Sequence, residues 1–274
     1  MLKLKPMSLP LATSITHQHL LSAIASEVRE RKAVTITDAG CGGGALMRYL
    51  RTALPEVLPN CEINVNGFDV SDFAPHGNSN LKEGTLTVKI GAPWPYSDRS
   101  IDVLISNQVL EHVHDHGFFF KETARCLKTD GVAIYLAPVR ECLYDGHVCQ
   151  PLVHKIRNRD SAIRMIGIFR KLGFYSKLHA DILPKKQGQD FPEFAADYLS
   201  KHCNYISMRE MKRAARSVGL KLSFDYTPSF YTAKLRALAK REPQSCYSRH
   251  PLVDNMAAYL LRYISSVTMV LRHS

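Results

Sequence analysis

The sequence predicts a doubly wound α/β sheet with an insert beside its ligand-binding face. Between positions 33 and 138, short β-branched and apolar runs alternate five times with helical segments. Such alternation is typical of parallel strands joined by right-handed helical crossovers. A stretch of four glycines within residues 40–44 follows the first run. The alternation stops after Pro138, and residues 139–204 form a long excursion.

Composition places the chain among ordinary globular proteins. It has 274 residues, of which 45% are hydrophobic and 22% charged, enough for one large domain or a domain with an appendage. The seven cysteines show no Cys-x-x-Cys spacing, and we find neither a secretory signal nor an 18-residue apolar run, so we expect a cytoplasmic protein without a transmembrane segment. The net charge of +11 favours anionic partners, although its Lys and Arg residues are dispersed.

The first half of the chain contains most of the predicted sheet. Apolar residues at helical spacing, among them Leu20, Ile24 and Val28, predict the first helix, and β-branched or alternating runs predict the strands. In order, we expect an irregular segment 1–12, helix 16–31, strand 33–39, helix 46–54 ended by Pro55, and strands 62–69, 86–90 and 101–106, followed by a helix holding residues 118–127 and strand 131–138.

The second half of the chain departs from this alternation and then resumes it. The excursion contains a predicted helix at 160–172 and an aromatic segment at 191–198. Ser207 is a typical N-cap and Gly219 a typical terminator, so they predict a helix at 209–218. A strand at 221–226, a basic helical stretch at 231–241, a final helix and a strand at 265–271 complete the chain.

The chain divides into four predicted parts. They are an N-terminal helical segment, 1–32, a cofactor-binding core, 33–138, a lid or substrate cap, 139–204, and the remainder of the core with a helical insert, 205–274. Ligands of doubly wound sheets bind at the carboxyl ends of the strands. The glycine loop is suited to such a site because backbone N–H groups at a helix start can approach a ligand closely.

Four motifs follow one another between residues 38 and 113. They are Asp38-x-Gly40-x-Gly42-x-Gly44, Gly67-x-Asp69, the run from Trp94 to Ser106, and Val109-Leu110-Glu111-His112-Val113. Together they resemble class I S-adenosylmethionine-dependent methyltransferases of the type 11-like group. The resemblance implies a Rossmann-like seven-stranded sheet with an antiparallel last strand and S-adenosyl-L-methionine over the first two strand ends.

The resemblance also implies roles for individual residues. Gly40, Gly42 and Gly44 would let the backbone touch the methionine part of the cofactor, whose amino group Asp38 would help to hold. Asp69 would accept hydrogen bonds from both ribose hydroxyls. Asn107 stands where family members contact the cofactor through the backbone.

The motifs leave two questions open, namely how adenine is recognised and whether the glycine loop binds a different cofactor. Many relatives carry an aspartate after the third strand, but this chain has Gly91-Ala92, so adenine would be recognised by backbone groups or by Trp94, which is also typical of a packing residue. Gly40-x-Gly42-x-x-Ala45 also fits a nicotinamide-binding fingerprint. The preceding aspartate and the Leu-Glu-His-Val block favour the methyltransferase.

Methyl transfer to a hydroxyl needs a base near the cofactor rather than a nucleophile. Candidate side chains follow the fourth and fifth strands and are His147, His112, Glu111, His154 and Glu141. Residues 145–154 look similar to the loop after strand five in methyltransferases that act on sugars, where a histidine lies near the acceptor. His147 is therefore the first candidate base, and packing of the insert is its alternative role.

Glu111 and His112 also raise the question of a metal. In small-RNA 2′-O-methyltransferases a similar Glu-x-x-Glu-His arrangement holds magnesium, but Gln108 replaces the first acid here. We therefore predict no metal. The sequence predicts O-methylation of a sugar, glycan or other small-molecule hydroxyl, with two alternatives, an RNA-modifying methyltransferase and a catalytically silent cofactor-binding partner subunit.

Overall fold

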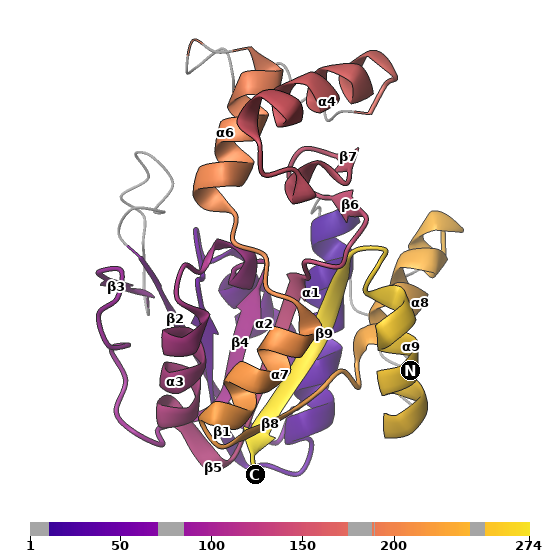
Figure 1. Ribbon diagram of the computed structural model, residues 1–274. Coiled ribbons are helices and arrows are strands. Elements are labelled where there is room, and N and C mark those ends of the chain that lie inside the picture. The colour runs from indigo at the N-terminus through magenta and orange to yellow at the C-terminus, as the bar shows by residue number, and fades with distance from the viewer. Residues whose placement is uncertain (1–10, 71–84, 175–187, 189, 242–249) are drawn as a thin grey trace.

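The computed structural model describes residues 11–70, 85–174, 188, 190–241 and 250–274. Its centre is a seven-stranded sheet with the strand order β3-β2-β1-β4-β5-β9-β8 (Figure 1). The strands are β1 (Ala33–Ala39), β2 (Glu62–Val70), β3 (Thr85–Val88), β4 (Ile101–Asn107), β5 (Leu127–Pro138), β8 (Leu220–Ser223) and β9 (Ser266–His273). The strand β9 pairs antiparallel with β5 and β8, and the other neighbouring pairs are parallel. The predicted fold class is confirmed.

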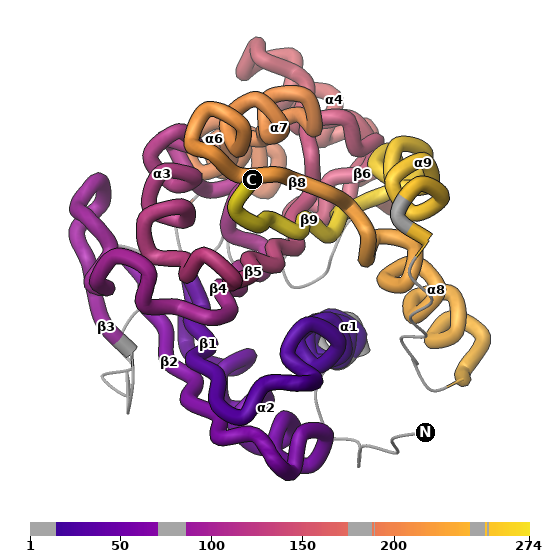
Figure 2. Tube along the Cα trace, turned by 90° about the horizontal axis from the view of Figure 1, so that it is seen from below, coloured from indigo at the N-terminus to yellow at the C-terminus, as the bar shows by residue number. Residues whose placement is uncertain are grey.

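Helices cover both faces of this sheet. They are α1 (Leu11–Val28), α2 (Ala45–Val57), α3 (His116–Cys126), α7 (Met208–Ser217), α8 (Thr227–Leu238) and α9 (Pro251–Leu261). Figure 2 shows α1 and α2 on one side of the strands and α3 and α7 on the other. Side chains alternate along each strand, so Ile36 and Ile134 pack in the α1-α2-α8 layer and Leu104 and Tyr135 in the α3-α7 layer.

The excursion after β5 folds into a cap with a small core of its own. It contains the hairpin β6 (Tyr144–Asp145) and β7 (Gln150–Pro151) and helices α4 (Arg159–Lys171) and α6 (Phe191–His202), which lie beyond the ends of the strands in Figure 1. Ile166, Phe191 and Ala195 are buried between the helices. The Asn204 N–H, just after α6, donates to the carbonyl of Glu111 at 2.6 Å. The cap is thereby attached to the loop that follows β4.

Several element boundaries differ from the sequence prediction. The segment 1–12 was expected to be irregular; residues 1–10 lie outside the described residues, and α1 already begins at Leu11. The helix α2 continues through Pro55 to Val57, because a proline in the last turn removes one hydrogen bond without blocking the remaining ones. The strand β8 ends at Ser223 rather than 226 because the chain turns there into α8, with Thr227 N–H bonded to the Phe224 carbonyl.

Within the described residues, no helix is long and apolar enough to cross a bilayer.

A buried carboxylate holds the amino ends of three strands together, at the opposite end of the sheet from the glycine loop. Asp102 of β4 is buried and accepts hydrogen bonds from Arg31 at 2.7 Å, from Lys128 at 2.9 Å and from the Thr35 N–H at 2.9 Å. One carboxylate thus joins the entry to β1 with β4 and the start of β5.

We predict that Asp102→Ala lowers the free energy of unfolding by about 3 kcal/mol, because it leaves a backbone N–H and two cations without their buried acceptor. Urea denaturation measures this change. Asp130→Ala, which removes a 75% exposed partner of Arg31, is the matched control and should cost less than about 1 kcal/mol. Equal costs for the two variants would contradict the central position of Asp102.

Candidate functional site

The glycine loop after β1 is fixed by backbone hydrogen bonds to β2. The N–H groups of Gly40 and Cys41 both donate to the Phe68 carbonyl, at 2.8 and 3.1 Å. Gly40 has φ of 81°, and a Cβ there would lie 2.5 Å from Cγ2 of Val109. Glycine is therefore required at this position by close packing against the loop after β4. The sequence had assigned it to contact with a cofactor.

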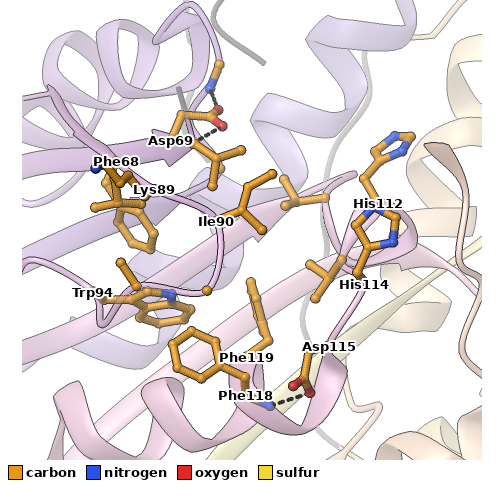
Figure 3. Close-up of a pocket in the computed structure, with 18 of the residues that line it drawn as sticks. Phe68, Asp69, Lys89, Ile90, Trp94, His112, His114, Asp115, Phe118 and Phe119 are labelled. Carbon is orange, nitrogen blue, oxygen red and sulfur yellow. Dashed lines mark hydrogen bonds between the residues drawn. The ribbon is translucent and has the colours of Figure 1, made fainter. Parts of the chain in front are cut away.

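Asp69, at the end of β2, connects the two strand ends. Its carboxylate accepts from the Gly42 N–H at 2.5 Å and from the Val70 N–H at 2.7 Å (Figure 3). Burial raises the pKa of Asp69, while these two hydrogen bonds act in the opposite direction. A carboxylate held in one orientation at the rim of a cavity is suited to accept two hydroxyl hydrogen bonds from a ribose.

Asp38 lies beneath the loop and has an unsatisfied oxygen. It is 2% exposed, and its Oδ1 has no hydrogen-bond partner within the described part of the chain. Burial raises the pKa of Asp38 to about 7, and the negative charge of Asp69 acts in the same direction. A buried carboxylate that lacks a partner fits the ammonium group of a bound amino acid.

A cavity of about 400 Å³ opens beside Asp69, and Asp38 is not among its lining residues. Gly40, Gly42 and Asp69 line its polar end. Its other end is largely apolar and is lined by Val88, Ile90, Ala92, Trp94, Phe118 and Phe119 (Figure 3). This shape matches an amphiphilic nucleoside ligand, with hydroxyls at the acid and a base among apolar side chains.

The structure places two residues whose roles the sequence had left open or assigned to the cofactor, Trp94 and Asn107. The Trp94 ring packs on Phe68 and Phe119 with centroids 4.9 and 5.1 Å apart, and it also lines the cavity, so packing and ligand contact are both served by one residue. Asn107, at the end of β4, is not among the lining residues. Its neighbours Gln108 and Val109 are.

Three of the five candidate bases, Glu111, His112 and His147, lie together beside this cavity. His112 lines the cavity, and its Nε2 is 3.3 Å from Nε2 of His147. Glu111 is fully buried, and its Oε1 is 4.0 Å from the same atom of His147. Burial raises the pKa of Glu111 to about 7, and burial lowers the pKa of His112.

A buried carboxylate, Asp145, organises the other side of His147. It accepts from the backbone N–H groups of His147 and Val148 at 2.9 and 3.0 Å and from the Tyr205 hydroxyl at 2.5 Å. The Tyr205 hydroxyl in turn lies 2.9 Å from Nδ1 of His147. Burial opposes the charging of His147, but the proximity of Asp145 and Glu111 results in a raised pKa.

The other two candidate bases lie away from the cavity. His154 is buried with its Nδ1 3.8 Å from Asp145 and its Nε2 3.6 Å from the Cys142 sulfur. Its surroundings are those of a packing residue in the cap. Glu141 accepts from the backbone of Met208 and lines a separate, basic groove.

Sequence reasoning missed three residues of this cluster. Asp145 entered the sequence analysis only as the first residue of the loop 145–154, and neither Tyr205 nor Cys203 was assigned to the site. The thiol of Cys203 lies with the imidazoles of His112 and His147 in a group whose nitrogen and sulfur atoms are all within 4.8 Å of one another. These positions are up to 91 residues apart, and no spacing signal connects them. The one local signal near them in the sequence is the polar pair Asn204-Tyr205 ahead of the Ser207 cap.

Comparisons with known proteins identify the family of the chain. A family model described as "Methyltransferase domain" matches residues 16–223. The ubiquinone biosynthesis O-methyltransferase of Pelagibacter ubique is 27% identical over 121 residues, which are 44% of this chain and 48% of that protein. This chain thus spans about half the length of the curated relative that it matches.

Solved structures of similar fold were also found. An S-adenosylmethionine-dependent methyltransferase from Mesorhizobium loti is 15% identical with a TM-score of 0.47, over 92% of this chain and 96% of that one. The geranyl diphosphate C-methyltransferase of Streptomyces coelicolor, solved with S-adenosyl-L-homocysteine, is 17% identical with a TM-score of 0.45, over 96% and 84% of the two chains. Likenesses of this degree concern the fold alone.

A glycine loop after β1 and a carboxylate after β2 define an α/β protein that binds a nucleoside-type cofactor. The chain belongs to the methyltransferase-domain family, whose model covers most of its length. The predicted S-adenosyl-L-methionine-dependent methyltransferase is thereby confirmed at the level of the family, and with it the cofactor. Asp38 and Asp69 fit this cofactor because one offers an unsatisfied buried oxygen and the other a carboxylate at the cavity rim.

We predict that cofactor affinity falls as the pH drops from 7 to 5. The pKa of Asp38 is raised to about 7 in the protein alone, so below that pH the carboxyl is protonated and loses its attraction for the ammonium group. Calorimetry should show a dissociation constant that rises by up to about tenfold per pH unit. Asp38→Asn should bind more weakly at pH 7 and lack this dependence. An unaltered pH dependence in the variant would contradict the assignment.

Proposed function

We propose that the protein transfers the methyl group of S-adenosyl-L-methionine to a hydroxyl oxygen of a small acceptor of the sugar or glycan type. The observation that carries the proposal is the position of His112, which lines the cofactor cavity and also contacts His147. A methyl group presented at that end of the cavity would face an imidazole cluster able to take a proton. Oxygen acceptors require such a proton acceptor.

The proposed division of labour follows from the contacts. The bound cofactor supplies an electrophilic sulfonium methyl group. Asp38 and Asp69 hold its two polar ends, while the acceptor hydroxyl is oriented against the cluster of Glu111, His112 and His147. His147 is the proposed base, since its Nδ1 is directed to Tyr205 and its Nε2 faces the cluster. The cap of residues 139–204 would enclose the acceptor and exclude water.

The curated relative supports the choice of oxygen, because its name describes an O-methyltransferase. The sugar or glycan class comes from the sequence of residues 145–154 alone. A cytoplasmic location remains our proposal and is supported by the cysteines, since the six within the described residues are all free thiols.

Transfer of labelled methyl groups into small-molecule extracts tests this function. We predict that His147→Gln lowers kcat by about 100-fold and leaves the cofactor dissociation constant within about twofold, because His147 does not line the cofactor cavity. Asp69→Asn should instead weaken cofactor binding by more than about tenfold. His250→Gln, at the start of α9, is the matched control and should change neither quantity.

Each alternative outcome has a distinct meaning. Cofactor binding without transfer to any acceptor would indicate the catalytically silent partner subunit. A His147→Gln variant with unchanged kcat would remove the base assignment and leave the cofactor site intact. Absence of cofactor binding in the unaltered protein would contradict the proposed function as a whole.

A specific surface favours RNA as a second candidate acceptor. A groove of about 480 Å³ is lined by Arg209, Lys212, Arg213, Arg216 and Arg262. The ammonium of Lys212 lies 5.0 Å from the Tyr259 ring centroid, and the Arg262 guanidinium lies 5.1 Å from it. Cations interleaved with an aromatic ring are typical of single-stranded nucleic-acid surfaces.

If RNA binds there, its affinity should fall steeply with salt, and Arg213→Ala should reduce the slope of log K against log salt by about 1. Filter binding of a short single-stranded RNA at several salt concentrations measures both effects. Arg29→Ala, an exposed arginine at the end of α1, is the control. No binding, or equal effects of the two substitutions, would exclude RNA from the groove.

A further inference from the structure

The hydrogen bonds around His112 fix which of its ring nitrogens carries the proton. Its Nδ1 lies 2.6 Å from the backbone carbonyl oxygen of His202. A carbonyl oxygen can only accept, so Nδ1 must be the protonated nitrogen. In the neutral imidazole, Nε2 therefore presents a lone pair.

The same argument applies to His147 through a longer chain of contacts. The Tyr205 hydroxyl gives its one proton to Asp145 at 2.5 Å. It must then accept from His147, whose Nδ1 is 2.9 Å away. The Nε2 atom of neutral His147 is thus also a lone-pair donor, and it faces Nε2 of His112 at 3.3 Å. Two lone pairs at this separation repel unless one nitrogen is protonated or a metal ion lies between them.

The separation of the two nitrogens suits a metal ion. Zinc binds imidazole nitrogen at about 2.0–2.1 Å in tetrahedral geometry, which places two such ligands about 3.3 Å apart. The observed distance between the Nε2 atoms, 3.3 Å, equals this value. The outward hydrogen bonds, from one Nδ1 to a carbonyl and from the other to a tyrosine–carboxylate pair, are those that orient metal-binding histidines elsewhere.

Two further donors lie near these nitrogens, with Cys203 in the same close group as the imidazoles and Glu111 beside His147. The Cys203 sulfur and the two imidazoles offer atoms that all lie within 4.8 Å of one another. Glu111 is fully buried, neither of its carboxylate oxygens has a hydrogen-bond partner within the described residues, and Oε1 lies 4.0 Å from Nε2 of His147. A thiolate and a carboxylate together neutralise a dication. A buried orphan carboxylate would thus gain the partner that it lacks.

We propose that His112, His147, Cys203 and Glu111 bind one divalent transition-metal ion of the zinc type. Thiolate and imidazole ligands favour such an ion over magnesium or calcium, which prefer oxygen. The prediction of no metal rested on Gln108 standing in place of an acid. The donors proposed here come from later parts of the chain, so that substitution does not bear on them.

The ligands come from three segments, namely the loop after β4, the β6-β7 hairpin and the end of α6. An ion held by all of them would tie the cap to the sheet beside the cofactor cavity. The ion would lie in the cluster that the proposed function uses, and in this respect the inference rests on that function. With the ion bound, an acceptor hydroxyl at this end of the cavity would be activated by its positive charge rather than by a free imidazole.

Metal binding is measured on the full chain without cofactor or acceptor. After removal of metals with a chelator, the protein should take up one equivalent of Zn²⁺ in competition with a chromophoric chelator. Co²⁺ in its place should show thiolate-to-cobalt charge-transfer absorption. Cys203→Ser should abolish that absorption, and His112→Gln should lower Zn²⁺ affinity by about 100-fold or more. Cys149→Ser and His250→Gln, which alter residues outside the cluster, should bind as the unaltered protein does.

An unchanged circular dichroism spectrum and thermal unfolding midpoint show that a variant is folded, and Tyr205→Phe provides a second test because it retains all four ligands. This variant should lose about tenfold in Zn²⁺ affinity through loss of the His147 orientation. No Zn²⁺ uptake by the unaltered protein, or uptake unaffected by both ligand substitutions, would overturn the proposal and leave a proton shared by the two histidines. Because neither cofactor nor acceptor is present, failure of the proposed function would not alter these results.

Discussion

The geometry of the candidate site depends on one buried carboxylate, Asp145. It accepts three hydrogen bonds, from the His147 and Val148 backbones and from the Tyr205 hydroxyl. Through Tyr205 it determines which nitrogen of His147 carries a proton, and through the backbone it fixes the β6-β7 hairpin. Since Asp145 lies in the cap and Tyr205 just before α7, this carboxylate also determines how the cap meets the sheet. Without it, the imidazole at the mouth of the cavity would have neither a fixed position nor a fixed tautomer.

The cofactor end of the site depends on the parallel pairing of two strands rather than on one carboxylate. Parallel pairing of β1 and β2 brings Asp38 opposite Gly67 and Ala39 opposite Phe68, so the two strand ends lie together. A Cβ at Gly67 would lie 2.8 Å from the Asp38 carbonyl oxygen, which explains why glycine stands directly before the Phe68-Asp69 pair. The backbone thus places two acids side by side at the carboxyl ends of β1 and β2. Desolvation raises the pKa of both carboxyls. A cationic or hydroxyl-bearing ligand group would supply the polar partner that water does not provide in the buried site.

Much of the fold could be predicted because it is encoded locally. The alternation of apolar runs predicted every strand of the sheet within a few residues. Ser207 marked the start of α7 as an N-cap, and the structure adds a capping box with Glu210. Asp38, Asp69 and the glycines could be found because they stand at strand ends and match the motifs of the methyltransferase family. Cys203, Asp145 and Tyr205 could not be connected in this way. Their proximity to His112 depends on how residues 139–204 fold back over the sheet, which is a matter of tertiary packing and leaves no periodic trace in the sequence.

The proposed function requires that the cofactor's methyl-bearing end and the histidine cluster meet at His112. A crystal structure with bound S-adenosyl-L-homocysteine tests it most directly. The account predicts that the ribose hydroxyls contact Asp69, that the adenine lies among Val88, Trp94 and Phe118, and that the sulfur faces His112 and His147. A ligand bound in the same cavity with its sulfur directed away from the two histidines, or bound elsewhere on the protein, would contradict the account.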